Sequence, residues 1–176
     1  MTYTEKTLIG GIKFSEERVH YTITRPHSTQ ATINELLQHI NSKQINIPFF
    51  SHIVNGDTSR TCFCVSKKDA FSISEILEIS KDNNIDIITH IDVGSVTIFP
   101  HKKELALIAV IMSLMESLHL PVYSSCTSIS AYIFNTQITE LPTLAEQLTD
   151  IFALPENHSP FNQQFQLRQP RNVTAP

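Results

Sequence analysis

The sequence predicts an α+β fold of two βαββαβ units, each with a four-stranded antiparallel sheet and two helices on one face. Three observations predict it. Strand-type alternation and helix-type periodicity follow one another in the order β-α-β-β-α-β. The same order then occurs a second time. Two short segments also recur in similar form: residues 24–27 (TRPH) resemble residues 98–101 (IFPH), and residues 45–48 (INIP) resemble residues 118–121 (LHLP).

The first unit begins with a strand and a helix. Residues 19–24 alternate and are rich in β-branched and aromatic types, which is typical of a strand. Ser28 or Thr29 caps the helix that follows. The apolar residues of this helix have the i, i+3, i+4, i+7 spacing of one face: Ile33, Leu36, Leu37 and Ile40.

A hairpin and a second helix complete the first unit. Strands over residues 45–54 and 61–65 flank residues 55–57 (NGD), a hairpin signal because the turn needs residues that tolerate positive φ. The next helix places four residues on one face: Ile73, Ile76, Leu77 and Ser80. Residues 85–88 then return as the fourth strand of an antiparallel sheet.

The second unit repeats this order from about Gly94, and residues 96–99 form its first strand. Its first helix carries apolar residues at helical spacing: Leu105, Ile108, Ala109, Met112 and Met115. Strands over residues 121–126 and 129–134 follow. The second helix has a continuous apolar stripe: Leu141, Leu144, Ala145, Leu148, Ile151 and Phe152. We expect both Met112 and Met115 in the core.

The repeat divides the chain into two units and an arm. We assign residues 7–92 to the first unit and residues 93–154 to the second. Residues 7–12 resemble an extra strand before the first unit. Residues 155–176 are polar and proline-flanked, and we expect a C-terminal arm that is ordered only in part.

Composition argues against nucleic acid and membrane as partners. The formal net charge is −4, and the 13 Lys and Arg residues are scattered, so no basic stripe for a phosphate backbone is present. The most apolar stretch, residues 105–120, contains Glu116 and is shorter than the roughly 20 residues that span a bilayer. The first residues have no signal-peptide core, so we expect a cytoplasmic protein.

No pattern of catalytic or cofactor chemistry is present. The sequence lacks a Gly-x-Ser-x-Gly elbow, a phosphate-binding loop, placed carboxylate pairs and metal-ligand spacing, so we expect no enzyme activity, cofactor or metal. Cys62 and Cys64 face one side of a strand. We interpret them and Cys126 as small buried apolar side chains, with a metal site as the alternative. Five histidines lack any partner spacing and are predicted to be solvated: His20, His39, His90, His119 and His158.

Several segments together resemble the tandem ACT domains of aspartate kinases, which are ferredoxin-like units. The segments are residues 10–14 (GGIKF), 45–47 (INI), 55–56 (NG), 93–96 (VGSV) and 124–126 (SSC). The likeness covers most of the chain, from about Leu8 to Leu154. No kinase domain accompanies these segments, so the resemblance implies a non-catalytic regulatory module.

The resemblance also implies a ligand and an assembly. Such modules usually dimerise and bind an amino acid between the loop after one first strand and the second strand of a neighbouring module. The candidate ligand-binding residues are therefore His27, Ser28, Thr29, Gln30 and Ala31 in the first loop, His101 and Lys102 in the second loop, and His52, Ser124 and Ser125 on second strands. The alternative for the two loop histidines is a surface position without a role.

The glycine of the family's effector loop is missing in both units. Its place falls on Ala31 in the first loop, and lysines occupy the corresponding part of the second loop. The leading hypothesis is an amino-acid-sensing regulatory subunit that forms a homodimer. The alternative is a ligand-blind module for dimerisation or for docking on a separate enzyme. A remnant of a degraded kinase without a current function is a third interpretation.

Overall fold

The computed structural model describes residues 6–26, 31–79, 85–99, 105–128 and 130–155. The first unit contains β3 (Arg18–Pro26), α1 (Ala31–Ser42), β4 (Phe49–Asn55), β5 (Thr58–Ser66), a 3-10 turn (Lys67–Asp69), α2 (Ala70–Ile79) and the first part of β6 (Asp86–Phe99). The second contains the rest of β6, α3 (Leu105–Ser117), β7 (Ser124–Thr127), β8 (Tyr132–Gln137), a 3-10 turn (Ile138–Glu140) and α4 (Leu141–Ile151). Three short strands flank them: β1 (Thr7–Leu8), β2 (Gly11–Phe14) and β9 (Phe152–Ala153). The predicted α+β fold with two antiparallel units is confirmed.

The strand β6 belongs to both units. Its first part pairs with β3, from Thr24 opposite Asp86 to Arg18 opposite Val93, and its second part pairs with β8. The sheet order is β4-β5-β3-β6-β8-β7. The sequence predicted two separate strands, over residues 85–88 and 96–99. The structure joins them into one strand of 14 residues, so the predicted boundary between residues 92 and 93 falls inside it.

The N-terminal strands contact the second unit. β2 runs antiparallel to the second part of β6, from Gly11 opposite Phe99 to Phe14 opposite Val96. β1 pairs in parallel with β9, which follows α4. Ile9 and Ile12 are buried in the second core. These contacts favour grouping residues 7–14 with the second unit, whereas the sequence alone placed them ahead of the first.

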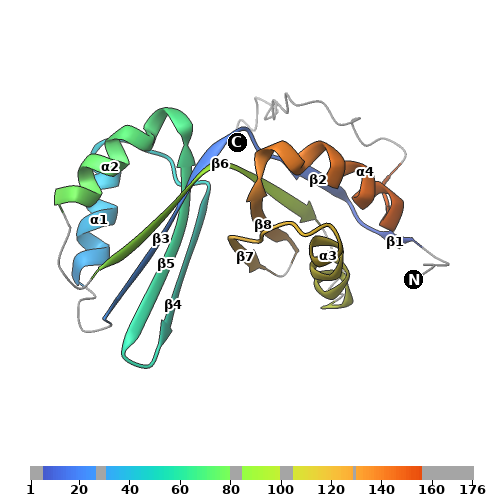
Figure 1. Cartoon of the computed structure of the whole chain (residues 1–176), viewed down its shortest axis with the longest axis horizontal. Coiled ribbons are helices and arrows are strands. Elements are labelled where there is room, and N and C mark those ends of the chain that lie inside the picture. The colour runs from blue at the N-terminus through green and yellow to red at the C-terminus, as the bar shows by residue number, and fades with distance from the viewer. Residues whose placement is uncertain (1–5, 27–30, 80–84, 100–104, 129, 156–176) are drawn as a thin grey trace, which may run out of the picture.

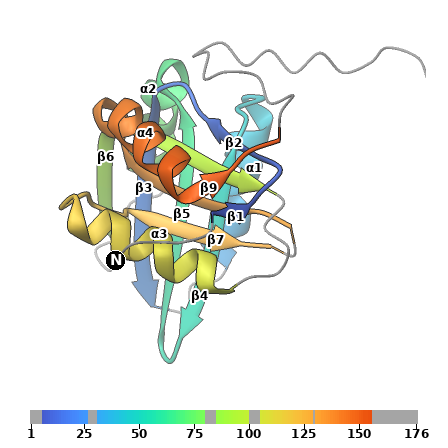
Figure 2. The ribbon, with the colours of Figure 1, turned by 90° about the vertical axis from the view of Figure 1, so that its right-hand side faces the viewer.

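The helices lie on the outer sides of the two units. Figure 1 shows α1 and α2 flanking the first part of the sheet and α3 and α4 flanking the second, with β6 passing from one unit to the other. Figure 2 shows α3 and α4 in front of the strands of the second unit. The faces without helices therefore turn toward each other. Phe49, Cys62 and Cys64 of the first unit pack there with Ile133 of β8.

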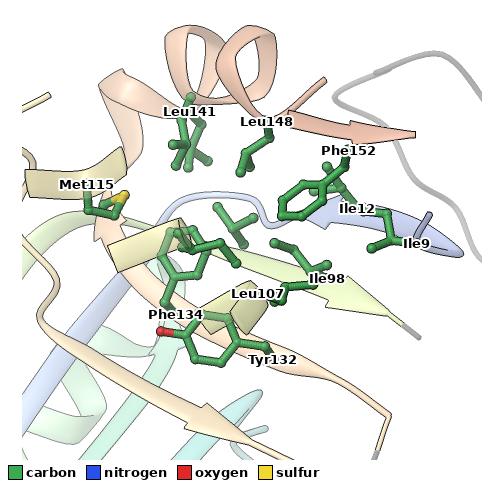
Figure 3. Packing of buried hydrophobic residues seen from close by; sticks show 13 residues of the cluster. Ile9, Ile12, Ile98, Leu107, Met115, Tyr132, Phe134, Leu141, Leu148 and Phe152 are labelled. Carbon is green, nitrogen blue, oxygen red and sulfur yellow. The ribbon is translucent and has the colours of Figure 1, made fainter. Parts of the chain in front are cut away.

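Each unit has its own core between its helices and its sheet. The first contains Val19, Tyr21, Ile23, Leu36, Ile40, Phe63, Val65, Ile73, Ile76 and Leu77. The second contains Ile9, Ile12, Val96, Ile98, Leu107, Ile111, Met115, Tyr132, Phe134, Leu141, Leu144, Leu148 and Phe152, and Figure 3 shows these side chains converging between α4, the β-strands and α3. The apolar stripe predicted for the last helix is largely buried in this core.

The buried face of α3 differs from the prediction. The structure buries Leu107, Ile111 and Met115, which are spaced by four residues. Met112 is 42% exposed, so its predicted place in the core was wrong. The helix is apolar around most of its circumference, and periodicity therefore gave no reliable choice of face.

Matching hydrogen bonds at the ends of α1 and α3 set the correspondence between the units. The amide of Ile45 donates to the carbonyl oxygen of Ile40, and the amide of Leu120 donates to that of Met115. Each donor directly follows a residue of positive φ, Gln44 or His119. The offset is 75 residues, counted from Ile45 to Leu120. The sequence echoes suggested 74 and 73. The echoed pair TRPH and IFPH is therefore out of register, because Thr24 faces away from the helices and Ile98 faces them.

We expect neighbouring residues of α3 to respond differently to truncation. Ile111→Ala should lower the free energy of unfolding by about 2–5 kcal/mol, because Ile111 is fully buried and its removal leaves a cavity. Met112→Ala, the matched control, should cost clearly less, about 1 kcal/mol, because its side chain is 42% exposed and lies outside the buried core cluster. Urea unfolding followed by circular dichroism measures both. Equal losses would contradict the orientation of α3.

Candidate functional site

Most of the ligand-binding residues predicted from sequence lie outside the described residues: His27, Ser28, Thr29, Gln30, His101 and Lys102. Ala31 begins α1, and its side chain is likewise not described. The structure places the other three, His52, Ser124 and Ser125. Each lies in a different region: His52 is on the helix-facing side of the first unit, Ser124 is at the junction of the two units, and Ser125 is exposed on the opposite side of β7.

His52 lies on β4 with its ring turned to the side of the helices. It is opposite Thr61, which is opposite Ile23 of the first core, and directly opposed residues share a face of the sheet. The His52 ring is half-buried, and its Nδ1 lies 2.9 Å from Thr61 Oγ1. One ring nitrogen is thus oriented by a buried hydroxyl.

Arg25 lies on the same face, one pair further along β3. Its side chain is only 4% exposed, and it is opposite the buried Ser59. Its Nε and Nη2 atoms have no hydrogen-bond partner within the described part of the chain. Burial lowers the pKa of Arg25 from its ordinary value. A buried guanidinium with two free donors is costly, because the desolvation of each N–H is not repaid.

This end of the first unit thus carries a distinct set of polar groups. Arg25 offers positive charge, Ser59 and Thr61 offer hydroxyls, and His52 stands on the neighbouring strand. Such a set suits a small ligand with a carboxylate and further polar groups. His52 was predicted from the sequence, whereas Arg25 was not. The signal was present, because alternation places Arg25 on the same side as Tyr21 and Ile23.

A chain of hydrogen bonds crosses the junction between the two units. Arg18 donates through Nη1 to Ser95 Oγ at 2.8 Å, and the Ser95 hydroxyl donates to Asn135 Oδ1. Asn135 Nδ2 donates to Ser124 Oγ at 2.8 Å, and Ser124 Oγ lies 2.8 Å from His20 Nε2. We call this set the junction relay. It begins and ends on β3 and passes through three strands of the second unit.

His20 is fully buried, so the prediction that it is solvated was wrong. Its ring lies 5.9 Å from that of His90 and 6.1 Å from that of Tyr123, while Tyr123 stacks on His90 at 4.1 Å. Tyr123 precedes β7 of the second unit. The second unit therefore covers a face of β3 that looks polar in the sequence.

The buried surroundings of His20 disfavour its charged form. Burial, followed by the nearby His90 and Arg60, lowers the pKa of His20 from 6.5 to about 4. Its Nδ1 also has no partner within the described residues. In the charged form both ring nitrogens are donors, so one N–H would have no acceptor there. His20 is therefore neutral at physiological pH.

The two neighbouring serines that were predicted together separate in the structure. Ser124 belongs to the junction relay. Ser125 is opposite Phe134 of the second core, so it points to the other side of β7, and it is exposed. The strand geometry therefore places these two candidate ligand-binding residues on opposite faces of β7.

Two of the three cysteines are buried at the junction. Cys62 and Cys64 are buried and share one face, as predicted, and burial raises the pKa of Cys64 to about 12. Cys126 is exposed, contrary to its predicted burial. Among the described residues, His, Cys, Asp and Glu side chains form no group suited to a metal ion. In that same part of the chain no helix has the length and apolar character needed to cross a membrane.

Comparison with solved structures identifies the fold. The regulatory subunit of aspartate kinase from Thermus thermophilus matches with a TM-score of 0.71 and 14% identity, over 82% of this chain and 99% of that one. The same subunit from Thermus flavus matches with a TM-score of 0.70 and 13% identity, over 83% and 99%. Aspartokinase III from E. coli, in complex with lysine and aspartate, matches with a TM-score of 0.59 and 8% identity, over 86% of this chain and 35% of that one. No protein-family model and no curated protein matches the sequence.

We expect acid to destabilise the protein through His20. Its pKa is lower in the folded chain than the unfolded value of 6.5, so its contribution is complete above about pH 6.5 and is lost as pH falls toward about 4. The full loss is roughly 3 kcal/mol, at about 1.4 kcal/mol per pKa unit.

Urea unfolding at a series of pH values measures this effect. His20→Gln should flatten the dependence between pH 4 and 6.5, since its amide does not titrate. His39→Gln is the matched control, because His39 is exposed on α1 and should leave the acid sensitivity intact. If the free energy of unfolding of His20→Gln fell with pH as steeply as that of the wild type, His20 would not be the source of the acid sensitivity.

Proposed function

We propose that this chain, which has the fold of aspartate kinase regulatory subunits, is a non-catalytic regulatory module of ACT type that senses an amino acid. The observation that carries the proposal is the extent of the match, since nearly the whole length of an isolated regulatory subunit is covered. In the E. coli enzyme the matching part is about a third of the chain. This correspondence supports a regulatory rather than a catalytic role, and we expect that role to be exerted in the cytoplasm.

The region around Arg25 and His52 supports an effector site in the first unit. Both face the helix side near the end of β3, and Ser59 and Thr61 lie between them in the strand order. We propose that the loop that follows Pro26, with the residues predicted from sequence, completes this site. An effector bound there shifts a quaternary equilibrium only in proportion to its difference in affinity for the two states.

The second candidate function is a ligand-blind module for dimerisation or docking. The edge strand β4 favours it, because β4 pairs with β5 alone among the described strands. β4 also carries exposed apolar side chains at Phe50, Ile53 and Val54. An edge of this kind is a template for pairing with another chain. A homodimer through β4 is compatible with both functions.

A thermal-shift screen against the proteinogenic amino acids tests the sensing function. An effector that binds only the folded protein should raise the melting temperature by roughly 5–10 °C at about 100 times its dissociation constant. The effect should be confined to one amino acid or a few related ones. If no amino acid shifts the transition at millimolar concentration, the sensing function is wrong and the ligand-blind module remains.

Light scattering after size exclusion tests the dimer. We expect the wild-type chain to be a dimer and Ile53→Lys to shift it toward monomer, because a charge on an exposed edge residue opposes strand pairing. Phe71→Lys is the matched control, since Phe71 is even more exposed but lies on α2. A dimer that persists in Ile53→Lys would move the interface away from β4.

A further inference from the structure

Arg25 is a buried cation whose charge has no counterpart in the described structure. The ion pairs there join Lys43 to Glu75 and Lys67 to Glu17 and Asp92. The carboxylate nearest in strand register is Asp86. It is opposite Thr24, so it lies on the other face of the sheet. Because side chains alternate between the two faces of the sheet, Arg25 and Asp86 lie on opposite faces.

The two free nitrogens of Arg25 form one geometric unit. Nε–H and the amino group Nη2 lie on the same edge of the planar guanidinium, with two N–H bonds nearly parallel. That edge matches the two oxygens of a carboxylate in a bidentate pair. Buried donors without partners are rare in folded proteins, and both free donors of Arg25 belong to this edge.

The strand beside Arg25 contributes neutral polar groups. Ser59 is directly opposite Arg25, and Thr61 is the next residue on the same face of β5; both are buried. Thr61 bonds to His52 of β4. The cation therefore stands at one end of a row of hydroxyl and imidazole groups, and no acid lies on the intervening positions.

We propose that Arg25 is the anchor for the carboxylate of the effector, which it binds side-on through Nε and Nη2, with Ser59, Thr61 and His52 toward the rest of the ligand. This inference rests on the proposed sensing function and specifies its ligand chemistry. The ligand carries a planar carboxylate, which replaces the water lost by the guanidinium and forms two charge-assisted hydrogen bonds. The carboxamide of the same molecule loses the charge and one acceptor, so it is rejected.

Three variants of the full chain test the anchor. Arg25→Met removes the charge and keeps an unbranched apolar stem. Arg25→Lys keeps the charge and removes the planar fork. Arg60→Met is the matched control, because Arg60 is opposite Thr24 and lies on the other face of the sheet. Melting temperatures without ligand come first: Arg25→Met should be as stable as wild type or more stable, since it removes an uncompensated buried charge.

Calorimetric titration then uses the amino acid that gives the largest thermal shift, its carboxamide, sodium succinate and inorganic phosphate. We expect the amino acid to bind wild type and Arg60→Met alike, and to bind Arg25→Met and Arg25→Lys at least about tenfold more weakly. The carboxamide should not bind wild type. In the ¹H–¹⁵N spectrum the Arg25 Nε–H signal should shift on titration with the amino acid.

The outcomes separate the anchor from the sensing function. An amino acid that binds Arg25→Met and wild type equally, or a carboxamide that binds as well as the acid, overturns the anchor and leaves the sensing function in place. Succinate binding that depends on Arg25, without any amino acid binding, upholds the carboxylate anchor and overturns amino-acid sensing. Binding of phosphate alone overturns the carboxylate assignment, and absence of all binding overturns both proposals. A large loss of stability in both Arg25 variants would show that the guanidinium is already paired, which also overturns the anchor.

Discussion

The sharing of strand β6 by the two units of one continuous sheet is the constraint on which the rest of the structure depends. β6 pairs with β3 over its first part and with β8 and β2 over its second part. Neither unit can therefore lose this strand without exposing an unpaired backbone, so the two units cannot separate as independent bodies. The same strand brings the helix-free faces of the units together and creates the junction where His20 is buried.

The junction joins positions that correspond in the repeat. The row Phe49, Cys64 and His20 of the first unit matches the row Ser124, Asn135 and Ser95 of the second, because each row consists of directly opposed residues at equivalent places. One row is mostly apolar and the other is polar. Within the junction relay, Nε2 of His20 in the first row bonds to the hydroxyl of Ser124 in the polar second row. Phe49 and Cys64 belong to a small apolar cluster beside this bond. A buried polar network of this kind favours one relative placement of the units, because a shifted placement leaves its groups unsatisfied.

The candidate effector site and the junction lie on opposite faces of the same strand. Arg25 projects toward the helices, and His20 projects toward the second unit, because they are five positions apart on β3 and side chains alternate between faces. β3 is thus a short physical connection between the candidate effector site on one face and the packing of the two units on the other. A displacement of β3 would change the lengths of the hydrogen bonds from Arg18 to Ser95 and between His20 and Ser124.

Local pattern by itself determined the order of the elements, the two-unit repeat and the apolar stripe of α4, because alternation and helical periodicity report which side of an element is apolar. The same pattern placed Cys62 and Cys64 on one face and would have revealed Arg25 on an apolar face. Local pattern gave the wrong answer where both sides of an element are equally apolar, and where a residue is buried by a segment distant in the sequence. α3 is apolar almost all round, so only packing selected Ile111 over Met112. The face of β3 that contains His20 looked solvated in the sequence, but the second unit covers it. β2 pairs with β6 because the pairing of β3 with β6 stops at Val93, which leaves that edge of β6 open beyond this residue. These last features depend on contacts between residues some 80 to 100 positions apart, which no local periodicity encodes.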